Sequence, residues 1–205
     1  MVVNRITTMG GRSGSGARGG GGGSLSSEQR QALDVAIGGY AFNPLNPRGI
    51  KDERIRTELT DAIKLYAKEV GFTDWYSIGL DNLPKGISGL KQGWTIKLSK
   101  SAYGGTYESA MKYFNSKIAS GESVVTSRPI AKTIVHELAH GTYQRLSPSG
   151  KSQVAATYKS FMGSSKRKGW GSYATKNVEE FYAEGIAKGL LGKSDSWTKA
   201  IRNAK

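Results

Sequence analysis

The segment AKTIVHELAHGTYQ, residues 131 to 144, carries both histidines of this chain, four positions apart, with a glutamate directly after the first. Residues four apart lie on the same face of a helix, so the imidazoles of His136 and His140 can bind one metal ion together. Glu137 lies about 100° further round the helix, where its carboxylate can reach a water on that ion without binding the ion. The apolar residues fall on the other side and can pack into a core: Ile130, Ala131, Ile134, Val135 and Leu138. The alternative is a helix with two histidines on a solvated face.

A catalytic zinc ion normally has three protein ligands and keeps a fourth position for water. The chain has no cysteine and no third histidine, which excludes disulfides and zinc fingers and leaves Asp, Glu or Tyr as the third ligand. The segment NVEEFYAEGIAKG, residues 177 to 189, is a predicted helix with Glu180 and Glu184 on one face, whereas Glu179 is expected to point elsewhere, into solvent. Glu180 is either the third ligand or, in the pattern N-x-x-E, the capping partner of Asn177.

The spacing of apolar residues divides the chain into helices, a small sheet and further helices, which indicates an α+β fold. Two strands are predicted, over residues 73 to 80 and 93 to 100, with a loop or hairpin between them. In the second strand Trp94, Ile96 and Leu98 alternate with Thr95 and Lys97. Helices are predicted over residues 26–37, 51–70, 106–120, from 127–129 through the histidines, and over 151–162, 178–190 and 196–202.

Residues 1 to 24 contain nine glycines, no acidic residue and almost nothing to bury after Met9. Such a segment cannot offset the entropy of ordering it, so it is predicted to be a flexible basic tail, followed by a single domain over residues 25 to 205. The tail lacks the apolar run of a signal peptide, and no stretch approaches the roughly 18 to 20 apolar residues that span a bilayer. We therefore expect no membrane association and a cytoplasmic or virion-associated protein.

The segment SYATKNVEEFYAEG, residues 172 to 185, resembles the segment after the zinc helix in the anthrax lethal factor group of metallopeptidases and in related metallopeptidase-like domains of phage and prophage head proteins. The pattern of that group is approximately S-Y, three residues, N, two residues, E-F-F-A-E. This chain matches at Ser172, Tyr173, Asn177, Glu180, Phe181, Ala183 and Glu184, and has Tyr182 in place of the second Phe. The runs GWTIKLSKSAY and RPIAKTIVHELAH also resemble the phage members, so the resemblance covers roughly residues 90 to 190.

The resemblance implies a zincin-like fold and a gluzincin-type zinc endopeptidase. In it Zn²⁺ is bound by His136, His140 and Glu180, while Glu137 is the catalytic base. Tyr173 provides a hydroxyl beside the metal, its alternative being an ordinary surface or core tyrosine. Glu184 accepts a hydrogen bond from a ligand histidine and so fixes the imidazole tautomer. An edge strand flanks the cleft and holds an extended substrate by main-chain pairing, through Trp94, Thr95, Ile96 and Lys97. The group often has Gly before the second His, where this chain has Ala139.

The net charge of +14 indicates affinity for an acidic peptide or protein substrate, for nucleic acid or for an anionic surface. The alternative is a solvated basic face that binds polyanions without specificity. Two other functions stay open beside the peptidase. One is a non-catalytic virion or head-associated protein that keeps the zinc fold, and the other is a basic nucleic-acid-associated module. A catalytic site is favoured because the chain has all four residues that it needs: His136, Glu137, His140 and Glu180.

Overall fold

The computed structural model describes residues 49–71, 77–93, 95–165, 167 and 169–204. These residues form an α+β structure of seven α-helices, one 3-10 helix and a small mixed sheet, which confirms the predicted class. The elements are α2 (Glu53–Val70), β1 (Ser77–Asp81), β2 (Gly89–Gln92), β3 (Thr95–Ser99), α3 (Lys100–Tyr103), α4 (Tyr107–Ala119), α5 (Pro129–Arg145), α6 (Pro148–Met162), η1 (Ser172–Thr175), α7 (Val178–Leu191) and α8 (Ser196–Asn203). The tail over residues 1–24 and the helix predicted over 26–37 lie outside the described residues.

The helix boundaries follow from capping residues and glycines. Asp52 caps α2 by accepting a hydrogen bond from Arg54 N at 2.9 Å, and Gly71 ends the helix with a φ of 86°. The helix predicted from residue 151 begins earlier, at Pro148, because Ser147 caps its first turn. No helix within the described residues combines the length and apolar character needed to cross a membrane.

The sheet has the strand order β1-β3-β2, with β1 parallel and β2 antiparallel to the central β3. Ile96 and Leu98 of β3 are buried, as their alternation predicts, while Trp94 lies outside the described residues. β2 falls inside the segment predicted as a loop or hairpin connection, and forms the hairpin with β3.

The expected role of Thr95, Ile96 and Lys97 as an edge that holds substrate is wrong. β3 is the central strand, so its main-chain groups pair with β1 on one side and with β2 on the other. A strand with both sides paired has no main-chain groups left to pair with a peptide. Within the described residues β2 is the edge strand that lies beside α5, and Lys91 N on this edge donates to Glu137.

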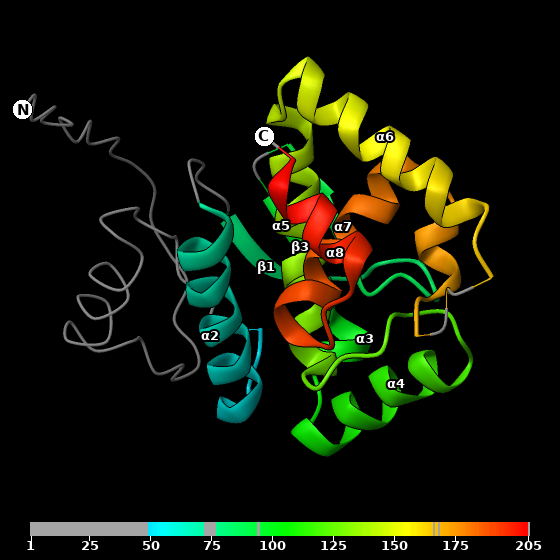
Figure 1. The fold of residues 1–205 in the computed structure, drawn as a ribbon. Coiled ribbons are helices and arrows are strands. Elements are labelled where there is room, and N and C mark those ends of the chain that lie inside the picture. Colours follow the sequence, from blue (N-terminus) through cyan, green and yellow to red (C-terminus); the bar gives the residue numbers. More distant parts are fainter. Residues whose placement is uncertain (1–48, 72–76, 94, 166, 168, 205) are drawn as a thin grey trace, which may run out of the picture.

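The central helix is α5, which packs against α2, α4, α7 and the sheet (Figure 1). Its predicted apolar residues are all buried, and so are His136 and Glu137, which excludes a solvated histidine face. The start of α5 is held by its neighbours: Glu58 of α2 accepts a hydrogen bond from Ala131 N, and Tyr103 donates one to Ile130 O. The helix therefore carries its histidines inside the fold, on a backbone that other elements fix.

The second helix of the core is α7, which packs against α5. α6 and α8 cover its outer side, with α6 running along the periphery of the molecule (Figure 1). A buried or half-buried aromatic cluster packs there, in which Trp170 stacks on Phe181 while Phe161 and Trp197 meet at tilted or edge-to-face angles. Large aromatic rings bury much apolar surface each, so this cluster fixes the position of α7 relative to the C-terminal helices.

β2 approaches α5 so closely that position 89 has room for glycine alone. A Cβ atom on Gly89 would lie 2.4 Å from Cγ2 of Thr133 and 3.0 Å from Oε1 of Glu137. Both neighbours belong to the buried side of α5. The glycine thus permits the contact between the sheet edge and the helix that bears the histidines.

We predict that G89A lowers the free energy of unfolding by about 1 to 3 kcal/mol, because overpacking forces β2 away from α5. Urea unfolding of the metal-free protein measures the change. G79A is the matched control, since a Cβ on Gly79 of the same sheet meets no atom within 4 Å. T133S, which removes the clashing methyl group, should recover part of the loss in the double variant. Equal losses in G89A and G79A would contradict the close approach.

Candidate metal centre

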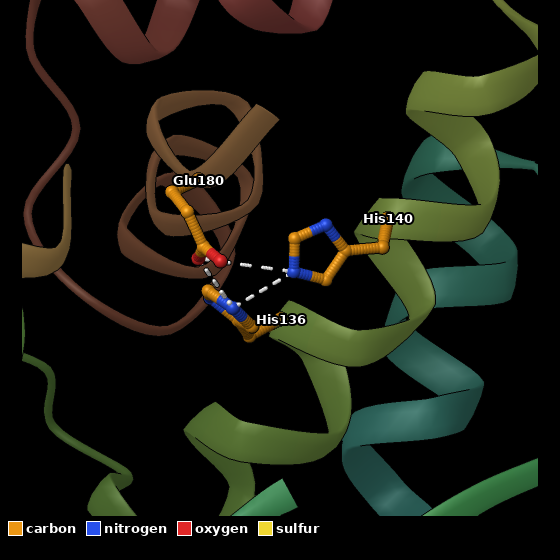
Figure 2. A group of neighbouring side chains, drawn as sticks. All are labelled: His136, His140 and Glu180. Carbon is orange, nitrogen blue, oxygen red and sulfur yellow. Dashed lines mark hydrogen bonds and ion pairs between the residues drawn. The ribbon is translucent and has the colours of Figure 1, made fainter. Parts of the chain in front are cut away.

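The side chains of His136, His140 and Glu180 converge between α5 and α7 (Figure 2). The two Nε2 atoms lie 3.1 Å apart, and Oε2 of Glu180 lies 3.1 Å from Nε2 of His136 and 3.8 Å from Nε2 of His140. Ligand atoms placed tetrahedrally about 2.1 Å from one zinc ion are about 3.4 Å apart. The three donor atoms therefore have the mutual spacing that a single ion needs.

The hydrogen bonding of Glu180 tests whether this donor set fits a metal. Among the described residues, the partners of its buried Oε2 atom are the Nε2 atoms of His136 and His140, and a buried carboxylate oxygen without such partners would be costly. Asn177 caps α7 through the main-chain N–H of Glu180, so the carboxylate is not needed for the cap and turns toward the histidines. Two nitrogens and one carboxylate oxygen form a donor set that suits Zn²⁺. The residues fit the ion.

Glu184 supports the first histidine, where the family resemblance expects a carboxylate. Its Oε1 atom lies 2.8 Å from Nδ1 of His136, and its side chain is fully buried. The same carboxylate forms an ion pair with Lys132 and accepts a hydrogen bond from Val124 N. Burial alone would raise the pKa of Glu184, but Lys132 and His136 outweigh it and lower the pKa to about 2. Glu184 is thus a fixed negative charge behind the ring of His136.

Glu179 does not point away into solvent, and this prediction is wrong. Its Oε1 atom lies 3.1 Å from Nδ1 of His140, and the side chain is 39% exposed. Glu179 precedes Glu180 on α7 and therefore borders the face that meets α5. Helical spacing gives the angle between the side chains of Glu179 and Glu180 around α7. It does not show from which side α5 approaches, so it could not place Glu179 beside His140.

Glu137 lies beside the converging groups without joining them. Its carboxylate is buried, and Oε2 accepts a hydrogen bond of 2.8 Å from the main-chain N–H of Lys91 in β2. Sequence reasoning missed this partner, because β2 could not be distinguished from a loop. A carboxylate held in place by a strand N–H can act as a general base at a fixed position.

Tyr173 enters from η1, and its ring centroid lies 6.3 Å from that of His136. The ammonium group of Lys176 lies over the ring of Tyr173, with Nζ 3.2 Å from the ring centroid. Both Tyr173 and the three converging side chains line one cavity of about 390 Å³. The structure thus places Tyr173 in the wall of the cavity that holds His136, His140 and Glu180.

The cavity runs along β2, with Gly89 and Lys91 on its wall. Ser99 N donates to Ser88 O at 2.9 Å, and main-chain groups alternate in direction along an antiparallel strand. The groups of Gly89 and Lys91 consequently face away from β3, and the bond from Lys91 N to Glu137 agrees with this direction. The strand that forms a wall of the cavity is therefore β2, and not β3 with Thr95, Ile96 and Lys97 as predicted.

The two histidines differ in their charge environment. Burial and Lys132 act to lower the pKa of His136, but the carboxylates of Glu180 and Glu184 outweigh them and raise it to about 9. Burial and the neighbouring His136 lower the pKa of His140. The metal-free site therefore holds a proton on one histidine, and binding a metal requires that this proton leaves.

We predict that the metal-free protein shows one histidine with a pKa near 9 and one below the ordinary 6.5. Since the folded pKa of His136 is raised, protonation stabilises the metal-free fold below about pH 6.5, and this stabilisation is lost as the pH rises through about 9. Two-dimensional NMR of the imidazole signals against pH measures both values directly, because the chain has two histidines. E184Q should lower the higher pKa, and two ordinary titrations near 6.5 would contradict this description.

Comparison with known protein families, with curated proteins and with solved structures finds no match to this chain. The candidate function therefore depends on the residues and geometry of the centre itself.

Proposed function

We propose that this chain is a zinc-dependent endopeptidase of the gluzincin type, with a zincin-like fold. The observation that carries the proposal is the convergence of His136, His140 and the buried Oε2 of Glu180, with Glu137 beside them in the same cavity. Three ligands, a separate carboxylate and an open cavity are the parts that metal-assisted peptide hydrolysis needs. The wall of β2 adds a place where an extended peptide can lie.

Bound zinc would lower the pKa of a water molecule towards about 7 and polarise a peptide carbonyl. The residues of this chain would carry the proton and hold the substrate. Glu137 takes the proton of the attacking water and delivers it to the leaving amine, from a position fixed by the N–H of Lys91. Tyr173 donates a hydrogen bond to the oxygen on which negative charge develops. Glu184 holds the ring of His136 in place.

The substrate proposed is a peptide in extended conformation, added as a strand to the outer edge of β2 at Gly89. The main chain of Gly89 faces the cavity and can pair with such a strand. The net charge of +14 favours substrates of acidic character and adds a non-specific affinity for polyanions. A peptidase of this kind could act in the cytoplasm or as a virion component.

The proposal is tested with the full chain, loaded with one equivalent of Zn²⁺ and incubated with a mixed peptide library. Mass spectrometry should find internal cleavage that a chelator stops and that added zinc restores. Binding of zinc at one per chain without cleavage would overturn the enzymatic proposal and favour a protein that keeps the zinc fold without turnover. Salt-sensitive retention on DNA, again without cleavage, would favour the nucleic-acid-associated alternative.

A further inference from the structure

We propose that Glu179 is the positioning residue of His140: its carboxylate accepts the Nδ1–H of that ring and so turns the Nε2 lone pair toward the metal position. The inference rests on the proposed zinc site and assigns a role to a residue outside the H-E-x-x-H and E-F-Y-A-E segments. It gives each ligand histidine its own carboxylate, Glu184 for His136 and Glu179 for His140.

The tautomer follows from what each partner can do. Nδ1 of His140 lies 3.1 Å from Oε1 of Glu179, and Nε2 lies 3.1 Å from Nε2 of His136. An ionised carboxylate only accepts hydrogen bonds, and a neutral imidazole carries one N–H. A hydrogen bond to Glu179 therefore places that hydrogen on Nδ1. Nε2 is then left as the atom that can bind a metal.

The first turn of α7 explains how two adjacent glutamates serve the same histidine differently. Asn177 fixes the start of the helix through the main-chain N–H of Glu180. From this fixed turn Glu180 reaches the Nε2 side of His140, at 3.8 Å, and Glu179 reaches the Nδ1 side. The ring thus lies between two consecutive carboxylates of one helix.

The two supporting carboxylates are not equivalent. Glu184 is fully buried and is also held by Lys132 and by Val124 N. Glu179 is 39% exposed and lies at the rim of the cavity. Contact with water weakens a charge-assisted hydrogen bond, so we expect a smaller effect from Glu179 than from Glu184.

The alternative role of Glu179 is to stabilise α7 alone, because an acidic residue in the first turn of a helix interacts favourably with the helix dipole. That role would affect the stability of α7 without affecting the ring of His140. Glu53 provides a matched control, because it is an exposed acid in the first turn of α2, far from the cavity in sequence and absent from its wall. The variants to compare are E179A, E179Q and E53A.

The first readout is the zinc dissociation constant, measured by competition with a chelating dye. Loss of a carboxylate behind a ligand histidine costs about 10- to 100-fold in affinity, so E179A should weaken binding about 10-fold. E179Q keeps an acceptor oxygen and should recover most of that loss, while E53A should bind as the unchanged chain does. Binding by E179A within about twofold of the unchanged chain would overturn the proposal.

The second readout is the tautomer of His140 in the metal-free, unsubstituted protein, from long-range ¹H–¹⁵N NMR correlations of the imidazole. We expect the hydrogen on Nδ1, and a hydrogen on Nε2 would overturn the proposal even if every variant failed to fold. If the chain bound no zinc, the proposed function would fail, while the tautomer would still report on the contact between Glu179 and His140.

Discussion

Replacing Glu137 by glutamine is expected to lower kcat for peptide cleavage by about 1,000-fold, because general acid–base catalysis contributes about 10²- to 10⁴-fold. The change removes the proton acceptor and leaves the metal ligands untouched. The amide oxygen of Gln can still accept the hydrogen bond from Lys91 N, so β2 should keep its position. Cleavage of a fluorogenic peptide found in the library experiment measures the effect, with zinc content checked in the same samples.

The control for this variant is E53Q, which removes an exposed carboxylate of α2 and should retain full activity. E137Q should bind zinc within about threefold of the unchanged chain, since Glu137 is not one of the converging donors. If E137Q kept kcat within tenfold, Glu137 would not be the base. A loss of zinc together with activity would mean that this carboxylate belongs to the metal site itself.

The second large effect is expected for E180A, which should weaken zinc binding by at least about 100-fold. Structural zinc sites with four ligands are worth about 10 to 16 kcal/mol, so one ligand accounts for about 3 kcal/mol. The N-terminus of α7 should survive the change, because Asn177 binds the main-chain N–H of residue 180 and not its side chain. Competition with a chelating dye measures the affinity, and urea unfolding of the metal-free variant measures the stability.

The two explanations of Glu180 give opposite patterns in these measurements. A third ligand loses zinc affinity on substitution, and in the metal-free protein it loses only its ion pair with protonated His136, an effect that disappears above about pH 9. A capping partner would lose about 1 kcal/mol of stability in the metal-free protein and keep its zinc affinity. The second pattern would refute the assignment of the third ligand, and the histidine pair would then need another carboxylate.

The helices could be predicted because their signals are local. Asp52, Ser147 and Asn177 mark helix starts, and Gly71 marks a helix end, through contacts within a few residues. β2 could not be predicted as a strand, because it is four residues long, starts with Gly89 and gains its pattern from pairing with β3. The order of the strands was equally out of reach, since it depends on pairings between distant segments.

In the candidate site, too, the residues placed by local helix geometry could be predicted, and those placed by contacts between distant segments could not. His136, Glu137 and His140 have positions that one turn of helix determines, so their grouping could be predicted from spacing. Glu179 could not be placed, because its contact with His140 depends on how α7 lies against α5. The bond between Lys91 N and Glu137 was also beyond prediction, since it joins a helix to a strand edge that only the folded chain creates.

The three proposed ligands come from two helices, two from α5 and one from α7, and residues 146–177 connect them. An ion bound there links the helices at both ends of this connecting segment, which includes α6. A ligand that binds only the folded state adds about 2.7 kcal/mol to the free energy of unfolding when its free concentration is 100 times Kd. The resistance of the chain to heat and to proteolysis would therefore increase with the concentration of free zinc. At low zinc concentration the protein would lose its activity and would also be degraded faster.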